Sequence, residues 1–183
     1  LAQAHYFLGL TYLRTQNLQQ AHQAFSEAIR LVPTFVEPHL ALATLHLQAQ
    51  EFEHAMKGAN HILQINPHHV QARLLLGRAL LGKEDAEKAV AVFKTVIQQA
   101  PQEPHGYHYL GLAYRLQKQH VVAQQAFEKA LSLNPQLIDS LREVVGISMT
   151  QGETEKALKR VRAQLQVSPE NPLVYNLLGG LLW

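Results

Sequence analysis

The chain has 183 residues, of which 47% are apolar, and this is enough apolar surface to bury a sizeable core. Its net charge of +2, from 16 Lys and Arg against 14 Asp and Glu, is too small and too evenly spread to predict nucleic acid or an anionic membrane as the partner. The sequence contains no Cys, which excludes disulfides, thiolate zinc sites and thiol catalysis.

Residue usage favours helices throughout. Leu, Ala, Gln and other good helix formers dominate, aromatic residues are only 7%, and runs of β-branched residues are absent, so we expect an all-α fold. No stretch approaches the eighteen or more apolar residues of a membrane span, and we therefore predict no direct membrane insertion. The compartment stays open, because both the cytosol and the periplasm contain chains without Cys.

Two ladders of identical residues run along the chain with one period of 34 residues. A fixed period in this range indicates a repeat architecture, so each period is expected to form one structural unit. The ladder residues are Ala21, Ala55, Ala89, Ala123 and Ala157 and, twelve positions further on in each unit, Pro33, Pro67, Pro101, Pro135 and Pro169.

We predict one domain over 1–183, with each repeat starting at the residue equivalent to Ala2, which is counted as position 1. The repeats are then 2–35, 36–69, 70–103, 104–137 and 138–171, followed by a partial repeat at 172–183. Positions 4, 7, 8 and 11 carry apolar or small residues, which is the stripe of an amphipathic helix, and positions 20, 24 and 27 predict a second helix. Each repeat is therefore expected to be a helical hairpin.

Small and large residues alternate across the two predicted helices. Position 8 is small in the first four repeats, as with Gly9 and Gly111, whereas position 24 carries a ring such as Phe25 or Phe127. A missing side chain where helices cross allows the ring to fill the gap, so we expect these positions to meet. Pro at position 32 cannot continue a helix and should end the second helix of every repeat.

The second and fifth repeats depart from this pattern. In the second repeat Ala59 stands at position 24 and Ile62 at position 27, so large and small residues have exchanged places. In the fifth repeat Ser148 stands at position 11 and Gln164 at position 27. We expect these two polar side chains to hydrogen-bond each other inside the hairpin.

The motifs "HYFLGLTY" with "AHQAFSEAIRLVP" and "YHYLGLAY" with "AQQAFEKALSLNP" resemble the tetratricopeptide repeat (TPR) family over essentially the whole chain. The resemblance implies a right-handed superhelical α-solenoid of antiparallel helix pairs, which binds a protein or peptide partner in a concave groove and is not an enzyme. In the family, first helices line that groove through positions 2, 5, 9 and 12, and here the neighbouring position 6 adds Tyr109. The candidate groove residues here are Tyr6, Leu10, Leu40, Thr44, Leu74, Arg78, His108, Tyr109, Leu112, Arg115 and Arg142.

The polar residues with which chaperone-binding members of this family hold a peptide carboxylate are missing from the matching positions. Tyr6 and Leu10, Ala41, and Gln71 and Leu75 stand there instead. The groove is therefore predicted to hold an extended or helical peptide through apolar anchors, with isolated Arg residues as contacts for acidic groups. The alternative is that these Leu residues only continue the hydrophobic core.

Other kinds of site find less support. His105 and His108 share a helical face and His68 and His69 adjoin, but no set of three ligands is apparent, so we predict no metal and no cofactor. No catalytic motif is recognisable, and no catalytic residue is predicted. A basic groove for RNA is also absent.

The sequence finishes on a sixth first helix, "YNLLGGLLW", that is apolar on more than one face. Leu177, Leu181 and Trp183 predict either further repeats or self-association of copies through this open end. The array is also similar to the repeat regions of larger bacterial proteins. The alternative function is therefore a non-catalytic part of a bacterial enzyme or of an envelope or exopolysaccharide-export protein.

Overall fold

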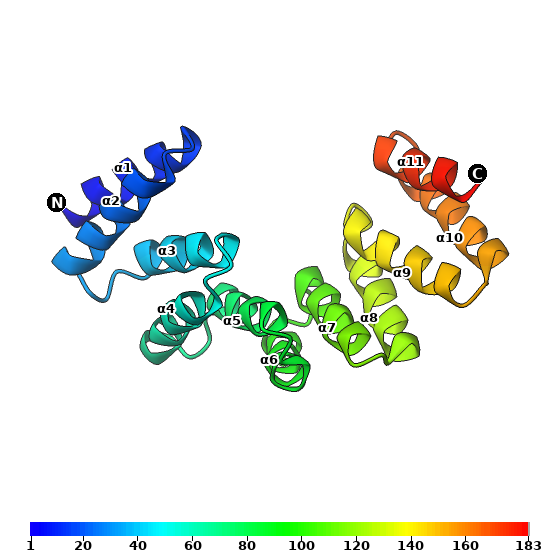
Figure 1. Ribbon diagram of the computed structural model, residues 1–183, viewed down its shortest axis with the longest axis horizontal. Helices are drawn as coiled ribbons and strands as arrows, with labels where there is room; N and C mark the ends of the chain where they lie inside the picture. The colour runs from blue at the N-terminus through cyan, green and yellow to red at the C-terminus, as the bar shows by residue number, and fades with distance from the viewer. Residues whose placement is uncertain (183) are drawn as a thin grey trace. The chain divides into compact units, whose positions relative to one another are not determined.

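The computed structural model describes residues 1–182 and contains eleven α-helices and no strand in that range (Figure 1). This confirms the prediction of an all-α fold. None of these helices is long and apolar enough to cross a membrane. In chain order they are α1 Ala2–Arg14, α2 Leu18–Leu31, α3 Val36–Gln48, α4 Phe52–Ile65, α5 Val70–Gly82, α6 Ala86–Gln99, α7 Pro104–Leu116, α8 His120–Leu133, α9 Ile138–Thr150, α10 Thr154–Val167 and α11 Pro172–Leu181.

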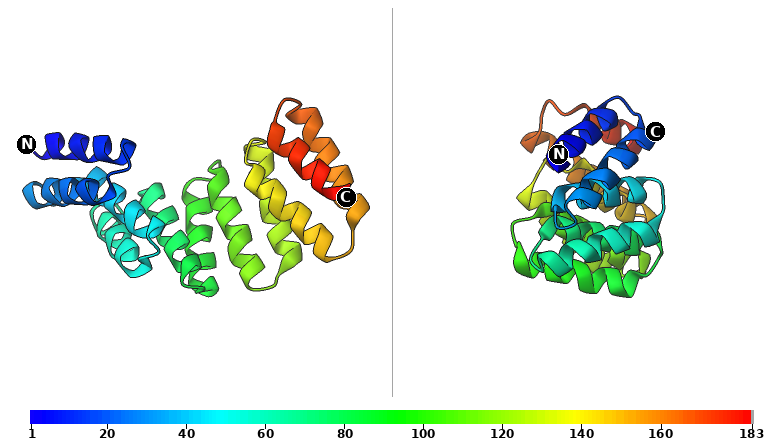
Figure 2. Two further views of the ribbon diagram at one scale, coloured as in Figure 1. Left: turned by 45° about the horizontal axis from the view of Figure 1, so that its top comes forward. Right: turned by 90° about the vertical axis from the view of Figure 1, so that its left-hand side faces the viewer.

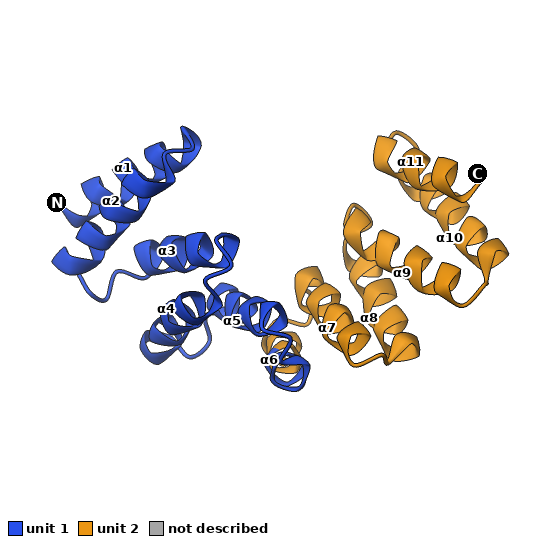
Figure 3. Cartoon of the chain, in the orientation of Figure 1, with its two compact units in different colours: residues 1–92 blue, residues 93–183 orange. Residues whose placement is uncertain are grey.

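The chain divides into two compact units, residues 1–92 and 93–183, with the boundary inside α6 (Figure 3). In the first unit, each of α1 to α4 packs against the next helix, and α3 also contacts α5. In the second unit, each of α7 to α10 packs against the next helix, and α9 also contacts α11. The paired helices of a hairpin, such as α1 with α2, lie side by side and antiparallel (Figure 2).

The helices begin in the register of the sequence repeat. First helices start at position 1 and second helices at position 17 of each repeat, without a shift from one repeat to the next. Each second helix ends two residues before its Pro. The residue between the two is extended, as at Val32 (φ −139°, ψ 90°) and Asn134 (φ −140°, ψ 96°), because a following Pro disfavours helical geometry.

A glycine on the first helix faces a phenylalanine on the second, as predicted. A Cβ atom added to Gly9 would lie 2.4 Å from the ring of Phe25, and one added to Gly111 would lie 2.6 Å from the ring of Phe127. Both rings are fully buried. The missing side chain therefore provides the space that each ring occupies.

The turn inside each hairpin uses a left-handed residue at position 15, which the sequence did not reveal. Gln16, Gln50, Glu84 and Lys118 have φ values of 60° or 61°, and Gly152 has a φ of 74°. Only Gly152 adopts this conformation without a steric cost to its own Cβ. Backbone hydrogen bonds around the turn hold the other four residues in this conformation. In the second repeat, for example, Glu51 N–H donates to the carbonyl oxygen of His46 at 2.8 Å.

The polar residues of the fifth repeat are buried, but the hydrogen bonds of Gln164 do not go to Ser148. The Gln164 amide donates to the carbonyl oxygen of Pro135 at 2.7 Å and accepts from Arg160 at 3.1 Å. Arg160 also donates to Glu128 on α8. Gln164 thus ties α10 to the loop before α9, which is a role that Ala28 and Ala130 at the same position of the first and fourth repeats cannot have.

We predict opposite effects of two Gly→Ala substitutions in the second unit. Gly111→Ala places a methyl group against Phe127 and should lower the free energy of unfolding by about 1–3 kcal/mol. Gly146→Ala, in α9, has no atom within 4 Å of the new methyl group and should raise it by about 0.5–1 kcal/mol. Urea unfolding followed by circular dichroism measures both, and equal effects would contradict the ring contact.

Candidate peptide-binding surface

A hollow of about 460 Å³ lies between α1 and α3 in the first unit. Its lining is mainly apolar, with Glu37 as its one charged side chain. It includes three of the predicted groove residues, Tyr6, Leu40 and Thr44. The full lining is Tyr6, Leu13, Leu18, Glu37, Leu40, Ala41, Thr44, Leu45 and Gln48.

The walls of this hollow are fixed by packing on both helices. On α1, the Tyr6 ring lies 6.0 Å from the ring of Phe25 and 5.4 Å from that of Phe35, measured between centroids. On α3, Leu40 packs against the core cluster that contains Ala43. The Thr44 hydroxyl donates to the carbonyl oxygen of Leu40 at 2.7 Å and is therefore already satisfied. Leu10 is exposed but does not line the hollow.

In the second unit, the predicted residues Tyr109 and Leu112 of α7 are half-buried. The ring of Tyr109 stacks on Phe93, with the centroids 5.6 Å apart. Leu112 packs against the core of this unit. Both side chains therefore present only part of their surface.

The predicted arginines are already engaged with groups of the chain itself. Arg115 pairs with Glu143 of α9 at 2.7 Å, and Arg142 pairs with Asp139 at 2.9 Å. In the first unit Arg78 also has an interaction within the chain. An acidic ligand would have to compete with these contacts, so the arginines are weaker candidates for acidic groups than the sequence suggested.

Two predicted residues, Leu74 and His108, are buried at position 5 of their repeats, with 5% and 8% of their surface exposed. They therefore have little surface to offer a partner. His108 Nδ1 lies 2.8 Å from Ser140 Oγ on α9, and its ring lies 5.7 Å from that of Phe127. The imidazole fills the contact between two first helices.

Burial lowers the pKa of His108 from 6.5 to about 4, because the charged imidazolium loses its hydration there. The folded chain then binds this proton only near pH 4, whereas the unfolded chain binds it near pH 6.5. The contribution of this site to stability is present above pH 6.5 and decreases as the pH falls from 6.5 to 4.

We predict that His108→Gln makes the protein less sensitive to acid. Between pH 7 and pH 5 the wild type should lose about 2 kcal/mol more unfolding free energy than the variant. Urea unfolding of both proteins at the two pH values measures this difference. An equal loss in both would contradict a neutral, buried His108.

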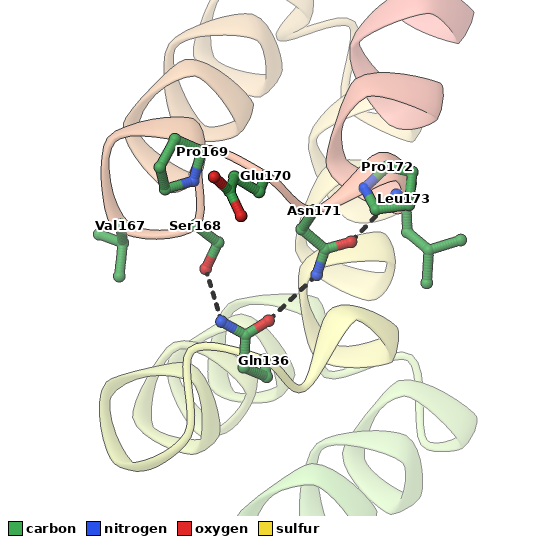
Figure 4. A pocket seen from close by; sticks show the side chains of 8 residues that line it. All are labelled: Gln136, Val167, Ser168, Pro169, Glu170, Asn171, Pro172 and Leu173. Atoms are coloured by element: carbon green, nitrogen blue, oxygen red, sulfur yellow. Dashed lines mark hydrogen bonds between the residues drawn. The ribbon is translucent and has the colours of Figure 1, made fainter.

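A second hollow, of about 540 Å³, lies where the loop between α10 and α11 approaches Gln136 (Figure 4). The Gln136 amide donates to Ser168 Oγ at 3.0 Å and accepts from the Asn171 amide at 3.1 Å. Asn171 Oδ1 accepts from the backbone N–H of Leu173. These polar groups bind one another, so they connect adjacent repeats and leave few free groups for a ligand.

Two of the histidines singled out in the sequence lie at helix starts. The His69 side chain accepts from the backbone N–H of Ala72 at the start of α5, and His105 Nδ1 lies 2.8 Å from the capping residue Glu103. The structure instead brings together His46, Glu51 and His54, a set that the sequence analysis missed. Its only sequence signal is the spacing H-x4-E-x2-H within one hairpin.

At the C-terminal end, Leu177 and Leu181 of α11 are half-buried and pack against the core of the second unit. Trp183 lies outside the described residues. The exposed apolar side chains here are Leu173, Tyr175 and Leu182. Self-association through this end stays a prediction, and these three residues are the ones that it now rests on.

Comparison with protein families matches these hairpins to one family. Sequence models of the tetratricopeptide repeat match residues 2–35, 59–110 and 104–137, which together cover more than half of the chain. The chain belongs to the tetratricopeptide repeat family. No curated protein matches its sequence.

Several solved structures are similar to this one. A thermophilic TPR protein of Thermus thermophilus is 18% identical, with a TM-score of 0.79 over 100% of this chain and 99% of the other. A segment of MamA from Desulfovibrio magneticus RS-1 is 20% identical, with a TM-score of 0.79 over 93% and 96% of the two chains. PilF of Pseudomonas aeruginosa is 20% identical, with a TM-score of 0.78 over 96% and 88%.

At these identities the solved structures establish the fold of this TPR protein and nothing finer. TPR arrays in general are scaffolds for protein–protein interaction. The surfaces described above are therefore candidates for contact with a protein partner.

Proposed function

We propose that this TPR protein is a scaffold that binds a peptide segment of a protein partner in the hollow between α1 and α3. The observation that carries the proposal is the size and lining of that hollow, about 460 Å³ with Leu13, Leu40 and Leu45 among its walls. Ligand sites in proteins are typically concave and mostly apolar, with a few polar groups that fix orientation.

The lining defines what kind of peptide fits. Aliphatic anchor residues of the peptide would replace water against the leucines and the ring of Tyr6. Glu37 is exposed on the first turn of α3 and favours a Lys or Arg beside those anchors. We therefore propose a peptide with aliphatic and basic residues, whereas the sequence suggested a peptide with acidic groups that contact arginines.

Glu37 lies in the first turn of α3, where a carboxylate also stabilises the positive end of the helix. In the second unit, by contrast, Arg115 and Glu143 form an ion pair between α7 and α9. We propose that this pair aligns the two first helices and does not contact the partner.

We predict that selection from a random peptide library on the purified protein enriches peptides with aliphatic and basic residues. A single enriched peptide should then bind Leu13→Glu and Thr44→Glu at least about 10-fold more weakly than wild type. The physical reason is that burial of one aliphatic anchor contributes about 1.5–3 kcal/mol, which a buried carboxylate would remove. Fluorescence anisotropy of the labelled peptide measures these affinities.

Thr11→Glu is the matched control, because Thr11 is exposed on α1 and does not line the hollow. Its affinity for the peptide should equal that of wild type. Thermal unfolding by circular dichroism checks that all three variants are folded. If the library yields no binders, or if the peptide binds Thr44→Glu as well as wild type, the proposal is wrong.

A further inference from the structure

Three side chains with metal-binding atoms converge at the turn between α3 and α4. His46 lies in the last turn of α3, Glu51 is the N-cap residue of α4, and His54 lies in the first turn of α4. One nitrogen or oxygen from each lies within 4.8 Å of the other two. Within residues 1–182, no other group of three His, Asp or Glu side chains meets in this way.

The backbone fixes this convergence. Glu51 N–H donates to the carbonyl oxygen of His46 at 2.8 Å, and Gln50 takes the left-handed conformation that closes the turn. Behind the turn, Ala43 of α3 and Ala59 of α4 belong to one buried cluster. The three side chains therefore project from a hairpin that backbone hydrogen bonds and a buried cluster hold in place.

The space between α3 and α4 is small because both helices carry small residues there. A Cβ atom added to Gly58 would lie 2.8 Å from the Cβ of Ala43. This close approach lets the rings of His46 and His54 stack with their centroids 5.1 Å apart. A third imidazole, His22 of α2, lies edge-on to His46 at 5.4 Å.

His46 Nδ1 lies 2.5 Å from Glu51 Oε2, so the imidazole and the carboxylate already face each other. Two imidazoles and one carboxylate are a donor set that zinc-type ions accept, and a fourth position is then left for water.

We propose that His46, Glu51 and His54 bind one divalent transition-metal ion of the zinc class. In a tetrahedral site with bonds of about 2.0–2.2 Å the ligand atoms lie roughly 3.3 Å apart. The 2.5 Å contact must therefore open and the widest separation must close, which rotations of the exposed side chains of Glu51 and His54 allow. The ion would join the end of α3 to the start of α4.

The nearest alternative in the first unit is the pair His39 and His61, whose rings lie 4.3 Å apart. Both Nε2 atoms already lie against the carbonyl oxygen of Pro33, at 2.8 Å and 3.3 Å. Among the described residues, no third ligand side chain joins this pair to make a metal site. The pair is therefore a structural contact.

Isothermal titration calorimetry of the complete chain with ZnCl₂, at about pH 7.5 because protons compete with metal ions for their ligands, tests the proposal. We expect one equivalent of Zn²⁺ to bind wild type, and His46→Ala with His54→Ala to weaken that binding by about 10-fold or more. The matched control, His68→Ala with His120→Ala, removes two exposed histidines elsewhere and should bind as wild type does.

A single substitution separates this site from general affinity of histidines for zinc. Glu51→Gln retains all eleven histidines and the shape of the side chain but removes the charge, and it should also weaken the one-equivalent binding about 10-fold. Circular dichroism without metal checks that every variant is folded. Equal zinc binding by wild type and the His46/His54 variant, or unchanged binding by Glu51→Gln, would overturn the proposal.

Discussion

The contact between a glycine on one helix and a phenylalanine ring on its partner sets the geometry on which the rest of this protein depends. Gly9 with Phe25 and Gly111 with Phe127 allow the two helices of a hairpin to approach until the ring is fully buried. The separation of the two helices then determines which side chains stay exposed on the surface of the hairpin. The surface between α1 and α3 exists because Phe25 fills the hairpin interior and supports Tyr6 from behind.

The second repeat solves the same packing problem in another way. Ala43 and Gly58 approach closely between α3 and α4, and the ring of Phe52 packs against Gly82 at the end of α5. The exchanged residues of this repeat, Ala59 and Ile62, are both fully buried. The resulting closeness of α3 and α4 is also what brings His46 and His54 together.

The period of 34 residues was enough to predict the helix pairs, their ends at each Pro and the ring contacts, because these depend on residues within one repeat. The groove residues depend on neighbouring repeats and were harder to predict. Tyr6, Leu40 and Thr44 line a hollow, whereas His108 is buried because Ser140 and α9 cover it. Likewise, Glu143 as the partner of Arg115, and the Pro135 carbonyl as one partner of Gln164, lie one repeat away, and no pattern within a single repeat indicates them.

Binding of a peptide partner in the hollow between α1 and α3 is the central claim. NMR spectra of the ¹⁵N-labelled protein with and without a selected peptide test it most directly. We expect the largest changes in amide chemical shift at the lining residues of α1 and α3, such as Leu13, Leu40 and Thr44. Changes confined to the second helices, or to α7 and α9, would contradict it.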